Sequence, residues 1–486
     1  MKVQKIIATM LLLALTALSI TSCVDIPPLD IESFPELNNS KEVSEAPVSQ
    51  PEESTQAGFT ERPNYTQIVN VTADRVVIAG TCEEGAVVKI TKGKEPVDVI
   101  SVGGYYITEV TLATSGKNRL EMTAKVEGKE ESTARIFYAD YKATVSERPD
   151  GLSVMVGLNS QLFLKKSYKE YNGENVLSTT EIKAFQTMLK NNYNSIQDKR
   201  VADLALLLTG ITKPDGMTDL EYLEMLRDIV RKDYKPVEVI YVMIPDAITL
   251  YPELVPEDLK TKTNTTRYQQ IIKAFKDDAD IKTQVIDMLP ILEKHKNDEY
   301  KLFNRTYTNW SDYAAYFAYE ELLNVISAKY PNSAPRPLSD FNIVTKDVMG
   351  GDLAKYMYLD RAATRDTFTV LEPKFTYTFQ TGDFYNGKDD LTLNITDKTA
   401  NAITSRREIK TSKEGFPSAV IYRDESITPI YNMLAEKFSN TIYFTMNSLT
   451  PRKVDLTHNK TKTGADYVIV FCTESSIDTL LASQMS

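Results

Sequence analysis

Three short apolar runs constrain the fold of this chain most strongly. They read PVEVIYVMIP at residues 236–245, PSAVIYRDES at 417–426 and ADYVIVFC at 465–472, and each contains β-branched residues. A strand with both faces covered reads as a nearly continuous apolar run, whereas a strand with one solvated face alternates. The runs therefore predict strands of a buried, mostly parallel sheet.

Helical segments separate these strands. Ser178–Glu181 and Thr218–Glu221 fit the capping-box pattern that opens a helix, and each precedes an amphipathic run. The helical stretch PIYNMLAEKF follows the strand segment at 417–426 at once. This alternation predicts an α/β domain, in which ligands meet the carboxyl ends of the strands. Asp424 and Glu425 directly follow such a strand end, so chemistry is expected there.

Residues 61–142 have a different sequence pattern, typical of short strands and turns. Segments such as VNVTADRVVIAGTCEEGAVVKIT, at 69–91, hold short β-branched runs broken by glycines and turn residues. Strands spaced by roughly 8–12 residues with turn signals predict a small all-β sandwich. The pattern resembles the immunoglobulin-like modules of bacterial surface proteins, which implies a spacer or a weak adhesion role.

The amino-terminal residues predict export and lipidation. Lys2 and Lys5 precede a short apolar run at 6–18, and small residues lead to Cys23. This order resembles a bacterial lipoprotein signal, which implies removal of residues 1–22, a lipid on Cys23 and an extracytoplasmic, membrane-anchored protein. Residues 23–60 are expected to form a disordered, acidic, Pro/Ser-rich tether.

Composition disfavours several classes of function. Apart from Cys23, the chain holds only Cys82, Cys472, His295 and His458 as thiol or imidazole groups, and their spacing matches no metal site. We therefore expect neither a metal nor another cofactor. The net charge of −11 argues against nucleic acid as a partner. Contact with the membrane is expected through the lipid alone.

Five segments, in order, carry a resemblance to a known family. The segments are VGLNSQLFL at 156–164, VIYVMIPDAITLYPELVP at 239–256, LSDFNIVTKDVMGGDLAKYM at 338–357, VIYRDESITPIYNMLAEKF at 420–438 and DYVIVFCTES at 466–475. On these segments, the chain resembles the DHHW proteins and the related alginate O-acetyltransferase-like members of the SGNH hydrolase superfamily over about residues 150–480. This resemblance implies an SGNH-hydrolase-like three-layer domain, with a mostly parallel sheet, at residues 145–486.

The resemblance implies a Ser-His-Asp site for moving acyl groups on extracellular polysaccharide, with the last two residues in an Asp-His-His-Trp motif. Aligned on Trp310, this chain has Tyr307 in place of the aspartate and Asn309 in place of the histidine, while Glu425 falls on the serine position. An amide cannot act as a general base, and a phenol with a pKa of about 10 stays neutral. Trp310 and Phe317 are expected in the core.

Two hypotheses of function follow. In the first, which we favour, the chain is a catalytically inactive relative that binds cell-envelope glycan or a protein, or acts as a scaffold. Its candidate ligand-binding residues are Tyr307, Asn309, Asp424 and Glu425.

In the second hypothesis, the chain is an active carbohydrate O-acetyl esterase or transferase with a displaced triad of Ser426, Asp455 and His458. Its Asp-x-x-His pattern is short and frequent by chance. A glycosidase pair of Asp424 and Glu425 is disfavoured, because adjacent residues seldom flank a bond at the required separation of roughly 5 Å or more.

Overall fold

The computed structural model describes residues 58–142, 152–166, 176–209, 211–233, 235–260, 265–379, 381–382, 407–411, 413–445 and 465–482. The predicted signal peptide, Cys23, most of the tether, Asp455 and His458 lie outside these ranges. Within them, every helix is too short or too polar to cross a membrane.

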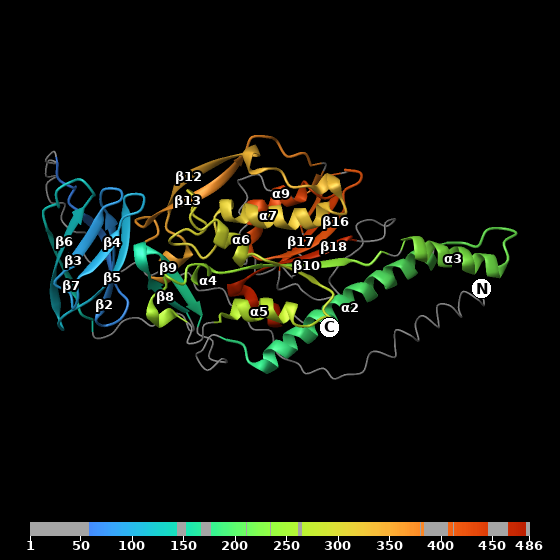
Figure 1. Cartoon of the computed structure of the whole chain (residues 1–486), viewed down its shortest axis with the longest axis horizontal. Helices are drawn as coiled ribbons and strands as arrows, with labels where there is room; N and C mark the ends of the chain where they lie inside the picture. The colour runs from blue at the N-terminus through green and yellow to red at the C-terminus, as the bar shows by residue number, and fades with distance from the viewer. Residues whose placement is uncertain are drawn as a thin grey trace. The chain divides into compact units, whose positions relative to one another are not determined.

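The amino-terminal described residues form an antiparallel β-sandwich (Figure 1). A three-stranded sheet in the order β1-β2-β5 faces a four-stranded sheet in the order β4-β3-β6-β7. Alternate residues of β6, including Leu120 and Met122, pack between the sheets. The predicted β-rich region is therefore confirmed. Its strands are β1 Asn64–Asn70, β2 Arg75–Thr81, β3 Val87–Thr91, β4 Val97–Ile100, β5 Tyr105–Thr111, β6 Lys117–Lys125 and β7 Arg135–Asp140.

The second part of the chain is built on a seven-stranded sheet in the order β11-β10-β18-β16-β17-β15-β14. Neighbouring strands from β11 to β17 pair in parallel, and β15 and β14 add antiparallel pairs at one edge. The three apolar runs form β10, β16 and β18, near the centre. The strands are β10 Glu238–Ile244, β11 Gln284–Asp287, β14 Thr381–Gly382, β15 Arg407–Lys410, β16 Ser418–Arg423, β17 Asn440–Thr445 and β18 Tyr467–Thr473.

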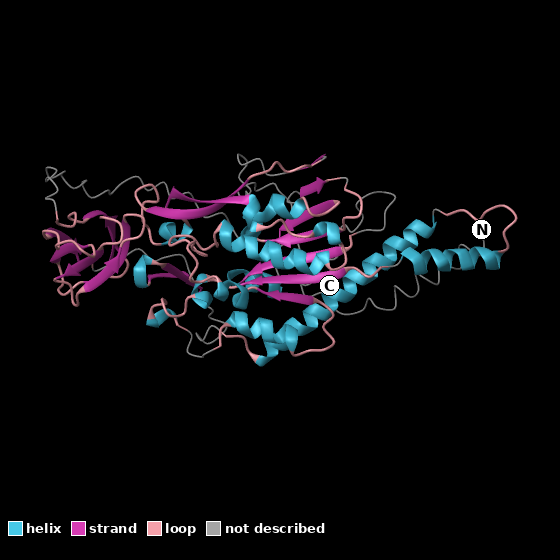
Figure 2. Ribbon diagram, turned by 45° about the horizontal axis from the view of Figure 1, so that its top comes forward, coloured by secondary structure: helices cyan, strands magenta, loops and turns pink. Residues whose placement is uncertain are grey.

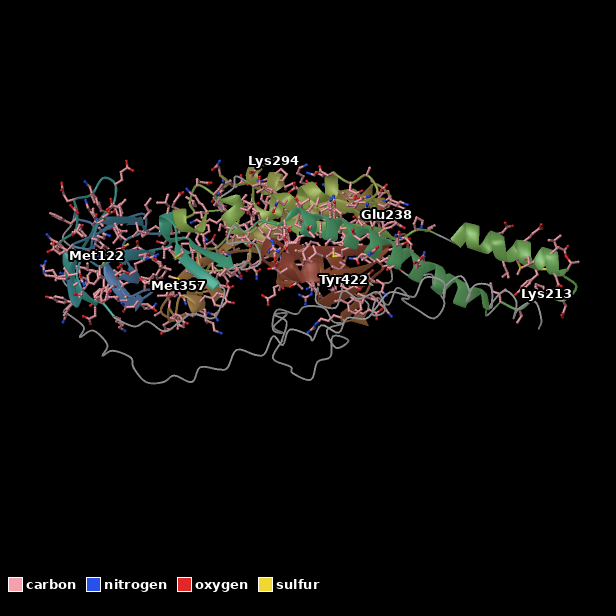
Figure 3. The ribbon with its side chains drawn as sticks, turned by 90° about the horizontal axis from the view of Figure 1, so that it is seen from below. Met122, Lys213, Glu238, Lys294, Met357 and Tyr422 are labelled. Atoms are coloured by element: carbon pink, nitrogen blue, oxygen red, sulfur yellow. The ribbon has the colours of Figure 1, made fainter. Side chains whose placement is uncertain are left out.

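Helices cover both faces of this sheet (Figure 2). Helices α6, α7 and α9 pack on one face, and α2, α5 and α10 pack on the other. Met122 of the sandwich and Tyr422 of the sheet are both fully buried (Figure 3). The helices are α2 Thr179–Thr209, α3 Asp219–Asp233, α4 Ala247–Leu250, α5 Arg267–Lys276, α6 Leu289–Lys294, α7 Asp312–Ser327, α8 Asp352–Tyr356, α9 Tyr431–Ala435 and α10 Ile477–Ala482.

Two hairpins complete the described chain. Strands β8, Leu152–Val156, and β9, Leu162–Lys166, pair antiparallel, as do β12, Phe341–Met349, and β13, Arg365–Pro373. Helix α8 lies in the connection between β12 and β13. These hairpins support the candidate site described below.

Both predicted capping boxes are present. The Ser178 N–H donates to Glu181 Oε2 at 2.7 Å, and the Glu181 N–H donates to Ser178 Oγ at 3.3 Å. Thr218 and Glu221 make the same pair of bonds at 2.8 and 3.3 Å. Reciprocal caps satisfy amide groups that the first helical turn leaves without partners, so they mark where α2 and α3 begin.

The prediction of a helix over PIYNMLAEKF, at 429–438, is wrong for its first two residues. Glu425–Ile430 forms a 3-10 helix that contains Pro429, and α9 begins only at Tyr431 and has five residues. Proline has no N–H to donate and hinders regular α-helix before it. Glu425 therefore lies in a tight 3-10 turn, without the N-terminus of a long helix beside it.

Candidate functional site

The segment that leads into the site is fixed at Thr306. Its N–H and hydroxyl both donate to Asp366 Oδ2, at 2.8 and 2.7 Å. The N–H of Gly351 donates to the Thr306 hydroxyl oxygen at 2.9 Å, and the N–H of Leu353 donates to its carbonyl at 3.0 Å. Strand β13 and helix α8 thus hold the chain just before Tyr307.

Trp310, at the end of this segment, lies in the core. Its side chain is only 2% exposed, and its indole N–H donates to the main-chain oxygen of Ser426 at 2.8 Å. Phe317, on α7, is 5% exposed. The expectation that both aromatic residues lie in the core is confirmed.

Asn309 and Glu425 face each other in the half-buried site. Asn309 Nδ2 donates to Glu425 Oε2 at 3.5 Å. Burial raises the pKa of Glu425, and the carboxylates of Asp352 and Asp424 add to that increase, whereas the Asn309 hydrogen bond opposes it. The structure therefore brings together the two positions at which the resemblance implies a histidine and a serine.

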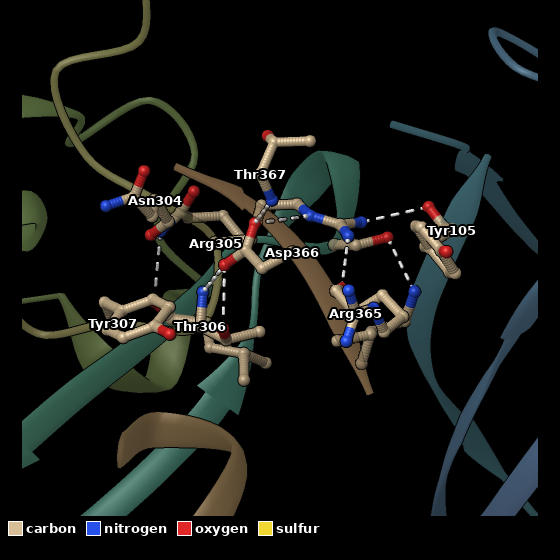
Figure 4. A network of polar contacts seen from close by, with 12 residues as sticks. Tyr105, Asn304, Arg305, Thr306, Tyr307, Arg365, Asp366 and Thr367 are labelled. Atoms are coloured by element: carbon tan, nitrogen blue, oxygen red, sulfur yellow. Dashed lines mark hydrogen bonds and ion pairs between the residues drawn. The ribbon is translucent and has the colours of Figure 1, made fainter. Parts of the chain in front are cut away.

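Tyr307, next to Thr306 (Figure 4), is half-buried and makes contacts of its own. Its hydroxyl donates to the Met349 carbonyl at 2.9 Å, and its ring meets Phe368 edge-to-face with centroids 5.4 Å apart. Burial raises the pKa of this phenol. A neutral phenol bonded to a main-chain oxygen can pack against a ligand, but it cannot supply the negative charge of an aspartate.

The carboxylate of Asp424 makes hydrogen bonds to two neighbouring segments of the chain. Its Oδ1 accepts from the N–H and the hydroxyl of Ser426, and its Oδ2 accepts from the N–H and the hydroxyl of Thr473, both at 2.9 Å. The carboxylate caps the 3-10 turn and joins it to the end of β18. Asp424, expected from the sequence to bind a ligand, thus has both carboxylate oxygens in hydrogen bonds within the chain.

Ser426 is enclosed in the same network. It is 1% exposed, and its hydroxyl donates to Asp424 rather than to an imidazole. Its proposed partners, Asp455 and His458, lie outside the described residues, so the structure contains one member of the displaced triad.

Asp352 is a site residue that the sequence analysis missed. Its Oδ1 accepts from the Thr308 N–H at 3.0 Å, and its Oδ2 accepts from the Thr308 hydroxyl at 2.5 Å. Burial raises the pKa of Tyr356, and the charges of Asp352 and Glu425 raise it further. The Gly-Asp-Leu segment had marked Asp352 as part of the resemblance, but only the tertiary structure brings it to Thr308, next to Asn309.

The assembled side chains suit binding by hydrogen bonds. They supply an amide, a partly buried carboxylate and a phenol, which are ordinary partners of hydroxyl groups. Across the described ranges, no cluster of three or more His, Cys, Asp or Glu side chains could hold a metal ion. The site residues described above, Tyr307, Asn309, Asp352, Asp424, Glu425 and Ser426, include no imidazole or thiolate.

A comparison with family models agrees with the resemblance. Residues 217–391 match the model of the SGNH hydrolase-like domain of acetyltransferase AlgX. The matched range contains β10, Tyr307–Trp310 and α8, and it ends before Glu425. The resemblance to the SGNH acetyltransferase-like group is confirmed. No curated protein matches the chain in sequence.

Solved structures of related proteins are also similar to this chain. They include a DHHW family protein from Eubacterium siraeum, with 13% identity, a TM-score of 0.41 and coverage of 68% of this chain and 93% of the other. PatB1 from Bacillus cereus has 11% identity, a TM-score of 0.41 and coverage of 67% and 97%. The O-acetyltransferase domain of AlgJ from Pseudomonas putida has 12% identity, a TM-score of 0.36 and coverage of 67% and 92%.

Proposed function

We propose that this chain is an extracytoplasmic lipoprotein whose SGNH-like domain binds a cell-envelope glycan and transfers no acyl groups. The observation that carries the proposal is the contact of Asn309 with Glu425, at 3.5 Å. An amide and a carboxylate stand where the resemblance implies a general base and a nucleophilic hydroxyl. An amide cannot act as a general base, and a carboxylate is a poor substitute for an activated hydroxyl, but both can bind sugar hydroxyls.

The surroundings of this pair favour a glycan over an apolar ligand. Glu425 is partly buried and has a raised pKa, so a hydroxyl donor from a ligand would stabilise its carboxylate. Tyr307 offers a half-buried ring, and its hydroxyl contacts Met349, whose side chain is 50% exposed. Aromatic and thioether groups of this kind pack well against the C–H face of a sugar ring.

The esterase alternative gains no support from Ser426. A nucleophilic serine needs an accessible hydroxyl bonded to a base, whereas this hydroxyl is buried and bonded to a carboxylate that already accepts from Thr473. The alternative would also require Asp455 and His458 to approach the buried side chain.

An acetyl-ester reporter tests the absence of catalysis. We expect wild-type protein and Ser426→Ala to hydrolyse p-nitrophenyl acetate equally slowly. A matched positive control restores the implied triad through Tyr307→Asp, Asn309→His and Glu425→Ser, and labelling of the new serine by a sulfonyl fluoride would show that it is activated. Turnover by the wild type that Ser426→Ala abolishes would contradict the proposal.

Titration calorimetry with oligosaccharides prepared from envelope polysaccharide tests binding. Asn309→Ala and Glu425→Gln should each weaken binding by about tenfold, because a hydrogen bond to a charged group contributes roughly 1.5 kcal/mol. Asp98→Asn, on the exposed face of the sandwich, is the control. Equal affinities in all variants would place the ligand elsewhere and favour a protein partner or scaffold role.

The remaining parts of the proposal concern the amino-terminal half. We infer that Cys23 carries the lipid that anchors the chain to a bacterial membrane, and that the sandwich is immunoglobulin-like. The two antiparallel sheets, of three and four strands, support the second inference. Metabolic labelling with an alkyne fatty acid should mark the wild type and spare Cys23→Ala; equal labelling would disprove lipidation at this residue.

A further inference from the structure

One sheet of the β-sandwich has an unexpectedly covered outer face. In β2, Val76 and Ile78 point into the sandwich core, yet Val77 and Ala79 on the opposite face are also buried. The outer residues pack, together with Ile107 of β5, against apolar side chains of the α8 region: Leu353, Ala354, Met357 and Leu359. A module that serves only as a spacer would keep this face polar and solvated.

A buried arginine adds a polar connection at the same place (Figure 4). Arg305 is 2% exposed, and its Nη1 donates to the main-chain oxygen of Tyr105, in β5, at 3.0 Å. Its Nη2 donates to the Arg365 carbonyl, in β13, at 3.1 Å. Its Nε lies 3.6 Å from Asp366 Oδ1. One guanidinium, next to Thr306 in sequence, thus binds the sandwich, the hairpin and the carboxylate that holds Thr306.

Further side chains connect the same elements. Gln67, in β1, accepts from the Asp360 N–H at 2.6 Å and donates to the Thr364 hydroxyl at 2.8 Å, just before β13. The N–H of Ile107, in β5, donates to Ser160 Oγ at 2.9 Å. The chain directly after Ser160 returns to the site, because the Leu162 N–H donates to the Arg305 carbonyl at 2.9 Å.

We propose that the β-sandwich positions the candidate site, with Arg305 as the positioning residue. Strands β2 and β5 support two elements, the segment from Arg305 to Trp310 and helix α8. The segment carries Asn309, which contacts Glu425, and α8 carries Asp352, which binds Thr308. The planar guanidinium suits this role, because it donates to two separate carbonyls in a rigid fork and forms an ion pair with a carboxylate. A lysine ammonium, as a point charge on a flexible stem, cannot reproduce all three contacts.

Trp310 permits a direct test, because it is the only tryptophan in the chain and lies at the end of the positioned segment. Acrylamide quenching of its fluorescence is measured in the full chain for Arg305→Lys and for Gln67→Ala. Arg119→Lys, an exposed change in the other sheet of the sandwich, is the control. We expect the quenching constant to rise by about twofold or more in both test variants, because local opening exposes a buried indole. The far-UV circular dichroism spectrum and the control should stay as in the wild type.

The outcomes separate positioning from a general contribution to stability. Urea unfolding of each variant gives the global effect, while quenching without urea gives the local one. A lower unfolding free energy with wild-type quenching in both folded variants would overturn the proposal. If Arg305→Lys fails to fold, Gln67→Ala decides alone, since its side chain is partly exposed and its loss leaves no buried charge. The measurement needs no glycan, so its result is independent of the proposed function.

Discussion

The indole N–H of Trp310 donates to the main-chain oxygen of Ser426 at 2.8 Å and joins two segments that lie 116 residues apart in sequence. The bond brings the end of the Tyr307–Trp310 segment against the 3-10 turn that carries Glu425. This structural role is independent of acyl chemistry. It explains why the tryptophan of the motif is present in a chain in which Tyr307 and Asn309 stand at the positions of the aspartate and the histidine.

Replacing this tryptophan should destabilise the protein. Trp310→Phe removes part of a fully buried side chain and leaves the Ser426 carbonyl without its donor, so we expect a loss of about 2–3 kcal/mol in unfolding free energy. Urea unfolding followed by far-UV circular dichroism measures the loss. Tyr138→Phe, at a ring that is 52% exposed, should change the free energy little. A Trp310→Phe variant as stable as this control would refute the structural role.

The internal role of Asp424 predicts a cost for a nearly isosteric change. In Asp424→Asn, an amide NH₂ replaces one of two carboxylate oxygens and faces the donors of Ser426 or Thr473. We expect a loss of about 2 kcal/mol, because a buried donor would lose its acceptor.

The exposed Asp98→Asn is the matched control for this change. Calorimetry also separates stability from binding. If Asp424→Asn weakened glycan binding while its unfolding free energy stayed unchanged, Asp424 would contact the ligand after all.

The buried carboxyl group of Asp312, in the first turn of α7, should make the stability of the protein depend on pH. Burial raises its pKa from 3.8 to about 6, although the Leu371 N–H donates to it at 3.2 Å. The folded state therefore holds this proton more tightly than the unfolded chain does. Stability from this group is full below about pH 4 and falls as pH rises through about 6.

The raised pKa of Asp312 also determines whether Asp312→Asn stabilises or destabilises the protein at each pH. This variant should match the wild type near pH 4 and exceed its unfolding free energy by up to about 3 kcal/mol above pH 7. Urea unfolding at a series of pH values tests the difference. If the difference in unfolding free energy between the two proteins stayed constant across these pH values, Asp312 would have the same pKa in the folded and unfolded states.

Gly351 permits a close approach at the site. A Cβ there would lie 2.4 Å from the Thr306 carbonyl oxygen and 2.6 Å from Tyr307 Cγ. Gly351→Ala should therefore push α8 away from Thr306 and cost about 2–3 kcal/mol, as overpacking does in other cores.

Gly216→Ala provides a control for backbone strain alone. Gly216 has a φ of +82°, but a Cβ at this position would meet no atom within 4 Å, so its substitution should cost only about 1 kcal/mol. Urea unfolding compares the two variants, and equal losses would argue against a steric role for Gly351.

Much of the architecture was predictable because its signals are local. The segments at 236–245, 417–426 and 465–472 have apolar residues on both faces, and they contain β10, β16 and β18. Capping boxes at Ser178 and Thr218 marked two helix starts, because the atoms that cap a helix lie within a few residues of one another.

The parts that could not be predicted depend on contacts between distant residues. Asp366 binds Thr306 from 60 residues away, and Asp352 binds Thr308 from 44 residues away. The Asn309–Glu425 pair came from the resemblance, not from any local pattern. The 3-10 turn at Glu425 did have a local signal in Pro429, but the helical periodicity that follows concealed it.

The covered outer face of β2 has a consequence for how this chain could have evolved and how it can be shortened. A module joined only by a linker can be exchanged by recombination without changes elsewhere. Here, a new amino-terminal module would have to match Leu353, Ala354 and Met357 in shape and accept the Arg305 guanidinium. A version of the chain that starts after residue 142 would expose those apolar side chains to water, and aggregation should follow.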